Sequence, residues 1–99
     1  MAYRIRFADT VVEHLRWLDV AERRRVLDAI EVQLSNEPLS ETRNRKPLRP
    51  NPIAPWELRV GKLRVFYEVA ADDPRVVRIL AVGKKERQTL RIGGKEIAL

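Results

Sequence analysis

The chain has 99 residues, no cysteine and a formal net charge of +6. This length suits one domain with a thin hydrophobic core, so we expect a single domain spanning residues 1–99. The lack of cysteine excludes disulfide bonds and thiolate chemistry. No apolar stretch approaches the roughly 20 residues of a membrane-spanning helix. Residues 1–12 contain no signal-peptide core, so we expect a cytoplasmic protein without membrane contact.

The positive charge is concentrated in two segments. Residues 41–64 carry seven basic and two acidic side chains, and residues 75–99 carry the same numbers, whereas residues 1–40 carry six and seven. A basic field confined to part of a small domain favours a polyanionic partner, either nucleic acid or an acidic protein segment. The alternative is a basic surface that only keeps the protein soluble.

The N-terminal part predicts a strand followed by two helices. Residues 2–7 alternate between apolar and basic side chains, as in a half-buried strand. Thr10 followed by Glu13 has the spacing of a capping box, so a helix should begin there. A second helix is expected over residues 21–35, after a short break that predicts a helical hairpin. The apolar positions expected to face a sheet are Val11, Leu15 and Leu18 in the first helix and Val26, Leu27, Ile30 and Leu34 in the second.

The C-terminal part predicts a long loop and three strands. Residues 36–55 hold five of the six prolines and read as a loop, and loops of that length are usually functional or disordered. Strands are expected over 56–60, 63–69 and 75–82, with Gly83 ending the third and a polar tail following. The order βααβββ predicts an α+β fold, in which the helical hairpin packs on one face of a small, mainly antiparallel sheet.

Alternation along the strands separates core residues from cations. Leu58, Val65 and Tyr67 should face the helices, which leaves Arg59 and Arg64 on the opposite, open face. Trp56 is expected in the core, because aromatic side chains mostly supply buried area. Beside Arg59 and Arg64, the open face is predicted to carry Lys84 or Lys85 after Gly83, and to form a concave cationic surface flanked by the loop residues Arg43, Arg45, Lys46 and Arg49. Arg87 and Arg91 are further candidates for phosphate binding.

The sequence contains no recognisable metal or cofactor site. His14 is the single histidine, and no cluster of metal-ligating residues accompanies it. We interpret His14 as a surface residue of the first helix, and we expect neither a metal nor a cofactor. No glycine-rich phosphate loop and no Ser-His-Asp set are present.

Two stretches carry a resemblance to a known family. WELRVGKLRVFYEV (residues 56–69) and VVRILAVGKKER (residues 76–87), together with the βααβββ order, resemble the RelE/ParE superfamily of type II toxin–antitoxin toxins. The resemblance implies a RelE-like fold and neutralisation by a cognate antitoxin. Its RelE branch contains metal-free ribonucleases that cut mRNA in the ribosomal A site, and its ParE branch contains inhibitors of DNA gyrase.

The resemblance also implies roles for individual residues. Arg64 matches the hairpin arginine that contacts the scissile phosphate, Lys85 matches a second catalytic cation, and Arg59 matches a basic residue of the preceding strand. Two features depart from the nuclease pattern. Pro55 and Glu57 stand where RelE-type enzymes carry lysines, and Arg91 stands where they carry a base-stacking tyrosine. The general base is therefore open between Glu57 and Lys85.

Three functions follow from the resemblance. The first is a ribosome-dependent mRNA endonuclease that inhibits translation, with mRNA on the ribosome as its target. The second is a gyrase inhibitor without catalytic residues, and the third is a toxin-fold protein that only binds its antitoxin. In each case an acidic, amphipathic antitoxin segment is expected to cover the basic surface.

Overall fold

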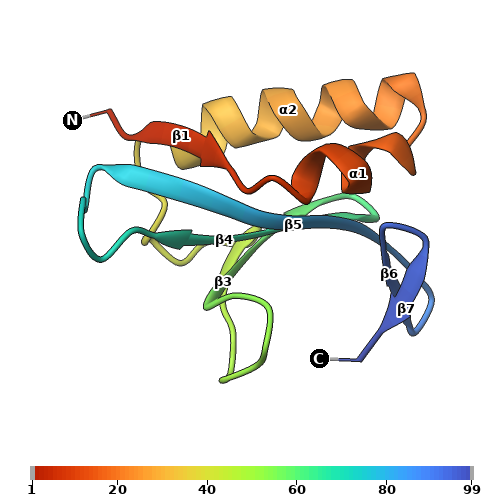
Figure 1. Cartoon of the computed structure of the whole chain (residues 1–99). Helices are drawn as coiled ribbons and strands as arrows, with labels where there is room; N and C mark the ends of the chain where they lie inside the picture. Colours follow the sequence, from red (N-terminus) through yellow and green to blue (C-terminus); the bar gives the residue numbers. More distant parts are fainter. Residues whose placement is uncertain (1, 99) are drawn as a thin grey trace.

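The structure is a computed structural model that describes residues 2–98, and it has two layers, a pair of helices over one twisted sheet (Figure 1). The predicted α+β architecture, with a helical hairpin on one face of a mainly antiparallel sheet, is confirmed. Three strands that the sequence did not predict, β2, β6 and β7, extend the sheet to seven strands in the described part of the chain. The elements are β1 (Arg4–Phe7), α1 (Val11–Arg16), α2 (Val20–Leu34), β2 (Arg45–Pro47), β3 (Trp56–Val60), β4 (Leu63–Val69), β5 (Val76–Glu86), β6 (Thr89–Ile92) and β7 (Lys95–Ile97).

Strand β5 organises the sheet. One edge of β5 pairs antiparallel with β4, while its other edge pairs first with β1 in parallel and then with β6 in antiparallel orientation. The prediction that Gly83 ends this strand is wrong. Gly83 lies within β5, and a Cβ atom there would lie 2.5 Å from the carbonyl oxygen of Arg91. The missing side chain therefore lets β6 approach β5 closely.

The main core lies between the helices and the sheet. Leu58, Val65 and Tyr67 are buried there as predicted, and Trp56 packs against them with its ring 6.1 Å from that of Tyr67. The buried Tyr67 hydroxyl donates a hydrogen bond to the Pro38 carbonyl oxygen at 2.6 Å, which ties the chain after α2 to the sheet. Leu27 was expected in the same core but remains 41% exposed, because α2 presents Val26, Ile30 and Leu34, at intervals of four residues, to the sheet.

A second, smaller core occupies part of the face turned away from the helices, which we call the open face. Phe66 on β4 is fully buried there, two residues from Arg64 on the same face. The loop before β3 and the β6–β7 hairpin cover it, through side chains that include Ile53, Ala54, Leu90 and Ile92. Because these segments occupy part of the open face, its cationic surface is smaller than predicted.

The capping box is found at the second helix and not at the first. The Asp19 carboxylate accepts a hydrogen bond from the Glu22 backbone N–H at 2.7 Å, and the Glu22 carboxylate accepts one from the Asp19 N–H at 3.0 Å. Thr10 makes no side-chain cap, so the predicted capping box at Thr10 is wrong. Its φ and ψ of −67° and −19° are already helical, whereas an N-cap residue is normally extended.

This difference gives a matched pair of substitutions. We expect Asp19→Ala to lower the free energy of unfolding by about 1 kcal/mol and the melting temperature by about 4–8 °C, because it removes a side-chain cap. Thr10→Ala should change neither quantity. Thermal unfolding followed by circular dichroism measures both, and equal melting temperatures for the two variants would contradict the assignment.

His14 is half-buried and not the surface residue that the sequence predicted. Its Nδ1 accepts a hydrogen bond from the Val82 backbone N–H at 3.3 Å, and its ring lies against Gly93 in the β6–β7 turn. Burial lowers the pKa of His14 below 6.5, although the Glu13 carboxylate partly opposes this effect. The neutral imidazole therefore links α1 to the sheet.

The lowered pKa of His14 predicts a pH dependence of stability. The unfolded chain binds a proton at His14 more readily than the folded protein, so the free energy of unfolding should be highest above about pH 6.5 and fall as the pH drops toward 5. His14→Asn, which keeps an acceptor near Val82, should weaken this fall. Urea unfolding at pH 7.5 and pH 5.5 measures it, and identical pH dependence in both proteins would exclude His14 as its source.

Candidate functional site

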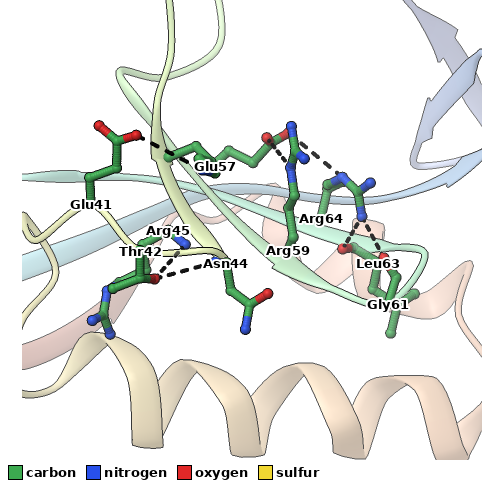
Figure 2. Close-up of polar contacts among 10 residues, drawn as sticks. Glu41, Thr42, Asn44, Arg45, Glu57, Arg59, Gly61, Leu63 and Arg64 are labelled. Atoms are coloured by element: carbon green, nitrogen blue, oxygen red, sulfur yellow. Dashed lines mark hydrogen bonds and ion pairs between the residues drawn. The ribbon is translucent and has the colours of Figure 1, made fainter.

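A carboxylate and two guanidinium groups meet on the open face of β3 and β4. The hairpin between these strands turns at Gly61 and Lys62, and its register places Arg59 directly opposite Arg64. Glu57 lies two residues before Arg59 and therefore projects from the same face. Figure 2 shows the Glu57 carboxylate between the two arginine side chains.

The Glu57 carboxylate is buried and interacts with both arginines. It accepts a hydrogen bond from Arg59 Nε at 2.9 Å and forms a longer ion pair with Arg64 Nε at 3.7 Å. The Glu57 side chain is only 8% exposed. A carboxylate is costly to bury unless cations and hydrogen bonds compensate for its lost hydration, and Arg59 and Arg64 provide both.

Arg64 is held in one orientation by its own hairpin. Its Nη1 donates hydrogen bonds to the carbonyl oxygens of Gly61 at 2.7 Å and Leu63 at 2.9 Å, as Figure 2 shows. Burial lowers the pKa of Arg64, the Glu57 charge opposes that effect, and the Arg59 charge adds to it. Arg64 remains a cation, since arginine is not deprotonated in proteins. Within residues 2–98, Arg64 Nη2 has no hydrogen-bond acceptor, so this donor is available to an anion.

Lys85 lies near this cluster and Lys84 does not. Gly83 pairs with Arg64 across the strands, and Lys85 lies two residues further on the same face, exposed to solvent. Lys84 projects from the helix-covered face, where its Nζ lies 2.7 Å from a Glu22 carboxylate oxygen. That hydrogen bond raises the pKa of Lys84 and is the main reason that the pKa of Glu22 is lowered. Lys84 is thus engaged with α2 and does not contribute to the open face.

Of the four cations that the sequence placed in the loop after α2, one is buried and stabilises the fold, and the others are at least partly exposed. Arg45 is buried, and its guanidinium donates hydrogen bonds to the Gln33 carbonyl oxygen at 2.8 Å and the Ser40 carbonyl oxygen at 3.0 Å. It is therefore not available as the phosphate-binding residue that the sequence predicted. Lys46 lies opposite Glu57 on β2, with its Nζ 3.9 Å from a Glu41 carboxylate oxygen. Arg43 and Arg49 are exposed.

Arg91 belongs to the other side of the sheet. It pairs with Lys84, which pairs with Leu63 of the main core, and residues paired across strands share a face. Arg91 therefore projects away from the face that carries Glu57 and Arg64 and does not join the cations of the open face. Arg87 lies at the tip of the β5–β6 hairpin.

The described residues show neither a metal cluster nor a membrane helix. No group of three or more His, Asp or Glu side chains in residues 2–98 could hold a metal ion. Neither helix in that range is long and apolar enough to cross a membrane.

The fold and this cluster define a small toxin of the type II toxin–antitoxin class. The sequence model of the ParE toxin family, described as the toxin of the type II toxin–antitoxin system parDE, matches residues 4–89. The chain belongs to this family and thus to the RelE/ParE superfamily, as the sequence resemblance predicted. A search of the curated proteins finds no match to the chain.

Two solved structures are similar to this chain. The toxin–antitoxin complex RelBE2 from Mycobacterium tuberculosis gives a TM-score of 0.69 and 29% identity, over 86% of this chain and 100% of the matched one. The RelE–RelB complex from Pyrococcus horikoshii gives a TM-score of 0.67 and 29% identity, over 88% of this chain and 99% of the matched one.

Removal of the buried carboxylate should destabilise the fold. We expect Glu57→Ala to lower the free energy of unfolding by about 2 kcal/mol, because it leaves the partly buried Arg64 without its counter-ion. Glu68→Ala is the control, since Glu68 on β4 forms a more exposed ion pair with Arg78 on β5 and its removal should cost less than about 1 kcal/mol. Urea unfolding measures both, and equal costs would show that Glu57 does not anchor the cluster.

Proposed function

We propose that this toxin cleaves mRNA on the ribosome and that Glu57, Arg59, Arg64 and Lys85 form its cleavage site. The observation that carries the proposal is the buried Glu57 carboxylate, which interacts with two guanidinium groups on the face of the sheet that the helices do not cover. Buried charges of opposite sign at a surface are typical of functional sites, where they tune acid–base and anion-binding groups. The ribosome would orient the substrate, so few protein groups would be needed. This target implies a cytoplasmic protein.

The proposed reaction is an attack of the ribose 2′-hydroxyl on the adjacent phosphorus. Glu57 accepts the hydroxyl proton while the O2′–phosphorus bond forms, and the phosphorus–O5′ bond breaks as Lys85 donates a proton to O5′. The products are a 2′,3′-cyclic phosphate and a 5′-hydroxyl end. Arg59 and Arg64 stabilise the charge that develops on the pentavalent phosphorus centre, with Arg64 Nη2 as the donor that no protein group occupies.

The Glu57 contacts suggest how the substrate activates the base. In the free protein, the Glu57 carboxylate is paired with Arg59 and Arg64, the cations that would bind the scissile phosphate. An arriving phosphate competes for Arg59, which is about half exposed and can move. As the guanidinium groups turn toward the phosphate, Glu57 loses stabilisation of its charged form and becomes a better proton acceptor. This mechanism assigns the base to Glu57 and leaves Lys85 as the acid.

A cognate antitoxin is the proposed protein partner. The two similar structures are complexes with an antitoxin, according to their descriptions. An acidic, amphipathic segment of such a partner would complement the cations Lys46, Arg59 and Lys85 of the open face and the exposed loop cations Arg43 and Arg49.

Primer extension on an mRNA translated in a purified system tests the cleavage proposal. We expect breaks that require both ribosomes and this protein. Glu57→Gln should slow single-turnover cleavage by at least about 100-fold through loss of the base, and Arg64→Ala should slow it by about 100- to 1,000-fold through loss of charge stabilisation. Arg24→Ala, on the exposed surface of α2, is the charge-matched control and should cleave normally.

The same samples separate the alternatives. Intact mRNA with the folded wild-type protein would exclude the nuclease. Inhibition of DNA supercoiling by purified gyrase would then identify a gyrase inhibitor, a function favoured by the ParE family match and by the absence of a lysine base on β3. Full cleavage by Glu57→Gln would instead remove Glu57 from the mechanism while leaving the nuclease.

A further inference from the structure

A cationic cavity lies at the end of the sheet away from Glu57. It has a volume of about 470 Å³ and is lined by Lys62, Glu86, Arg87, Thr89 and Arg91. These residues come from the β3–β4 turn and the β5–β6 hairpin, which are joined where the Lys85 N–H donates to the Lys62 carbonyl oxygen at 2.7 Å. Three cations and one carboxylate line the cavity, so its charge favours an anion.

A smaller cavity with an aromatic wall adjoins it. This second cavity has a volume of about 150 Å³, shares Glu86 and Arg91 with the first, and includes His14 and Trp17 of the α1 region among its lining residues. The Trp17 ring packs on Gly94 in the β6–β7 turn, where an added Cβ would lie 2.7 Å from three ring atoms. Trp17 nevertheless remains 63% exposed, so much of its indole is available for stacking.

The acidic groups nearby offset part of this positive charge and leave a net positive charge. Glu22 is engaged with Lys84, which also lines the smaller cavity. Glu86 lines both cavities, and Glu96 lies opposite Arg91 on β7. No ion pair in residues 2–98 involves Lys62, Arg87 or Arg91.

The backbone at Arg87 has a conformation that is unfavourable for arginine. Arg87 has a φ of 58°, the left-handed region that residues with a side chain rarely adopt. It is the first of two residues between β5 and β6, and hairpin turns that need a positive φ there favour glycine or asparagine. A strained position of this kind is a reason to look for a ligand of its side chain.

We propose that the two cavities together bind one nucleotide of a single RNA strand, outside the cleavage site. Lys62, Arg87 and Arg91 each contact a phosphate of the strand, and a base stacks on Trp17, the combination of cations and an aromatic face that single-stranded nucleic acids bind. The inference rests on the proposed function only in taking RNA as the ligand. Arg91 and Trp17 lie on the side of the sheet opposite Glu57 and Arg64, so this contact would anchor RNA without performing chemistry.

Fluorescence of Trp17 tests this site directly. The chain has two tryptophans, so the Trp56→Phe protein reports on Trp17 alone. We expect hexauridylate to quench its emission in a saturable manner, with binding weakened about 20-fold between 50 and 200 mM salt if three cations contact phosphates. If Trp56→Phe unfolds, Trp17→Phe replaces it, and this protein should lose the quenching that the wild-type protein shows.

Arg87→Gly is the decisive variant, because it removes the cation and relieves the positive φ. It should be at least as stable as the wild type, yet bind labelled hexauridylate more weakly, with the slope of log affinity against log salt reduced by about 0.7. Lys62→Ala should lower the slope similarly. Arg75→Ala, before the far end of β5, is the control and should bind normally.

The outcomes separate this site from the cleavage site. Glu57→Gln should keep the quenching of Trp17 by hexauridylate even though it loses cleavage, so failure of one proposal leaves the other testable. Unchanged Trp17 emission, or Arg87→Gly with wild-type affinity and salt dependence, would overturn the RNA site. Quenching by an acidic peptide but not by hexauridylate would also overturn it, in favour of a protein segment as ligand.

Discussion

The fold depends on β5 continuing as a strand through Gly83. Along one edge β5 pairs with β4, and along the other it pairs with β1 and then with β6. Any side chain at Gly83 would meet the Arg91 carbonyl oxygen and the Ile92 side chain. The absence of a Cβ therefore allows β6 and β7 to join the sheet. These strands cover Phe66 on the open face, and the Gly93–Gly94 turn between them lies against α1.

Charge balance at Glu57 links the stability of the fold to its proposed chemistry. A buried carboxylate beside a buried guanidinium is tolerated because each compensates for the lost hydration of the other. The same proximity arranges two cations around one anion before any substrate arrives. In the proposed mechanism, a phosphate takes the place of the carboxylate beside the two cations, and such prearranged charges are the main source of electrostatic catalysis.

The cations that give the chain its net charge of +6 lie on several surfaces and not on one. Arg45 is buried against the end of α2, and Lys84 is paired with Glu22, so both cations stabilise the fold. Arg59, Arg64 and Lys85 face one side of the sheet, whereas Arg91 faces the other. A long RNA that contacts both sides would have to pass around the end of the sheet, where Lys62 and Arg87 lie.

Local pattern was sufficient to predict the helical hairpin, the strands 56–60 and 63–69, and the faces of Leu58, Arg59 and Arg64, because alternation and turn residues act over a few positions. The same reasoning failed at Thr10, where only the backbone conformation shows that no cap forms. It also failed for β6 and β7, whose short segments are stabilised by pairing with β5 and by burial over Phe66.

The sequence by itself determined the class of fold, the family motif and the number of basic residues. Only the tertiary structure decided which of those cations meet Glu57, which are neutralised and which line a separate cavity. The physical reason is that strand register and loop packing join residues far apart in the chain, such as Lys84 with Glu22 and Arg45 with Gln33. A residue's neighbours, and not its charge alone, determine whether it can bind a phosphate.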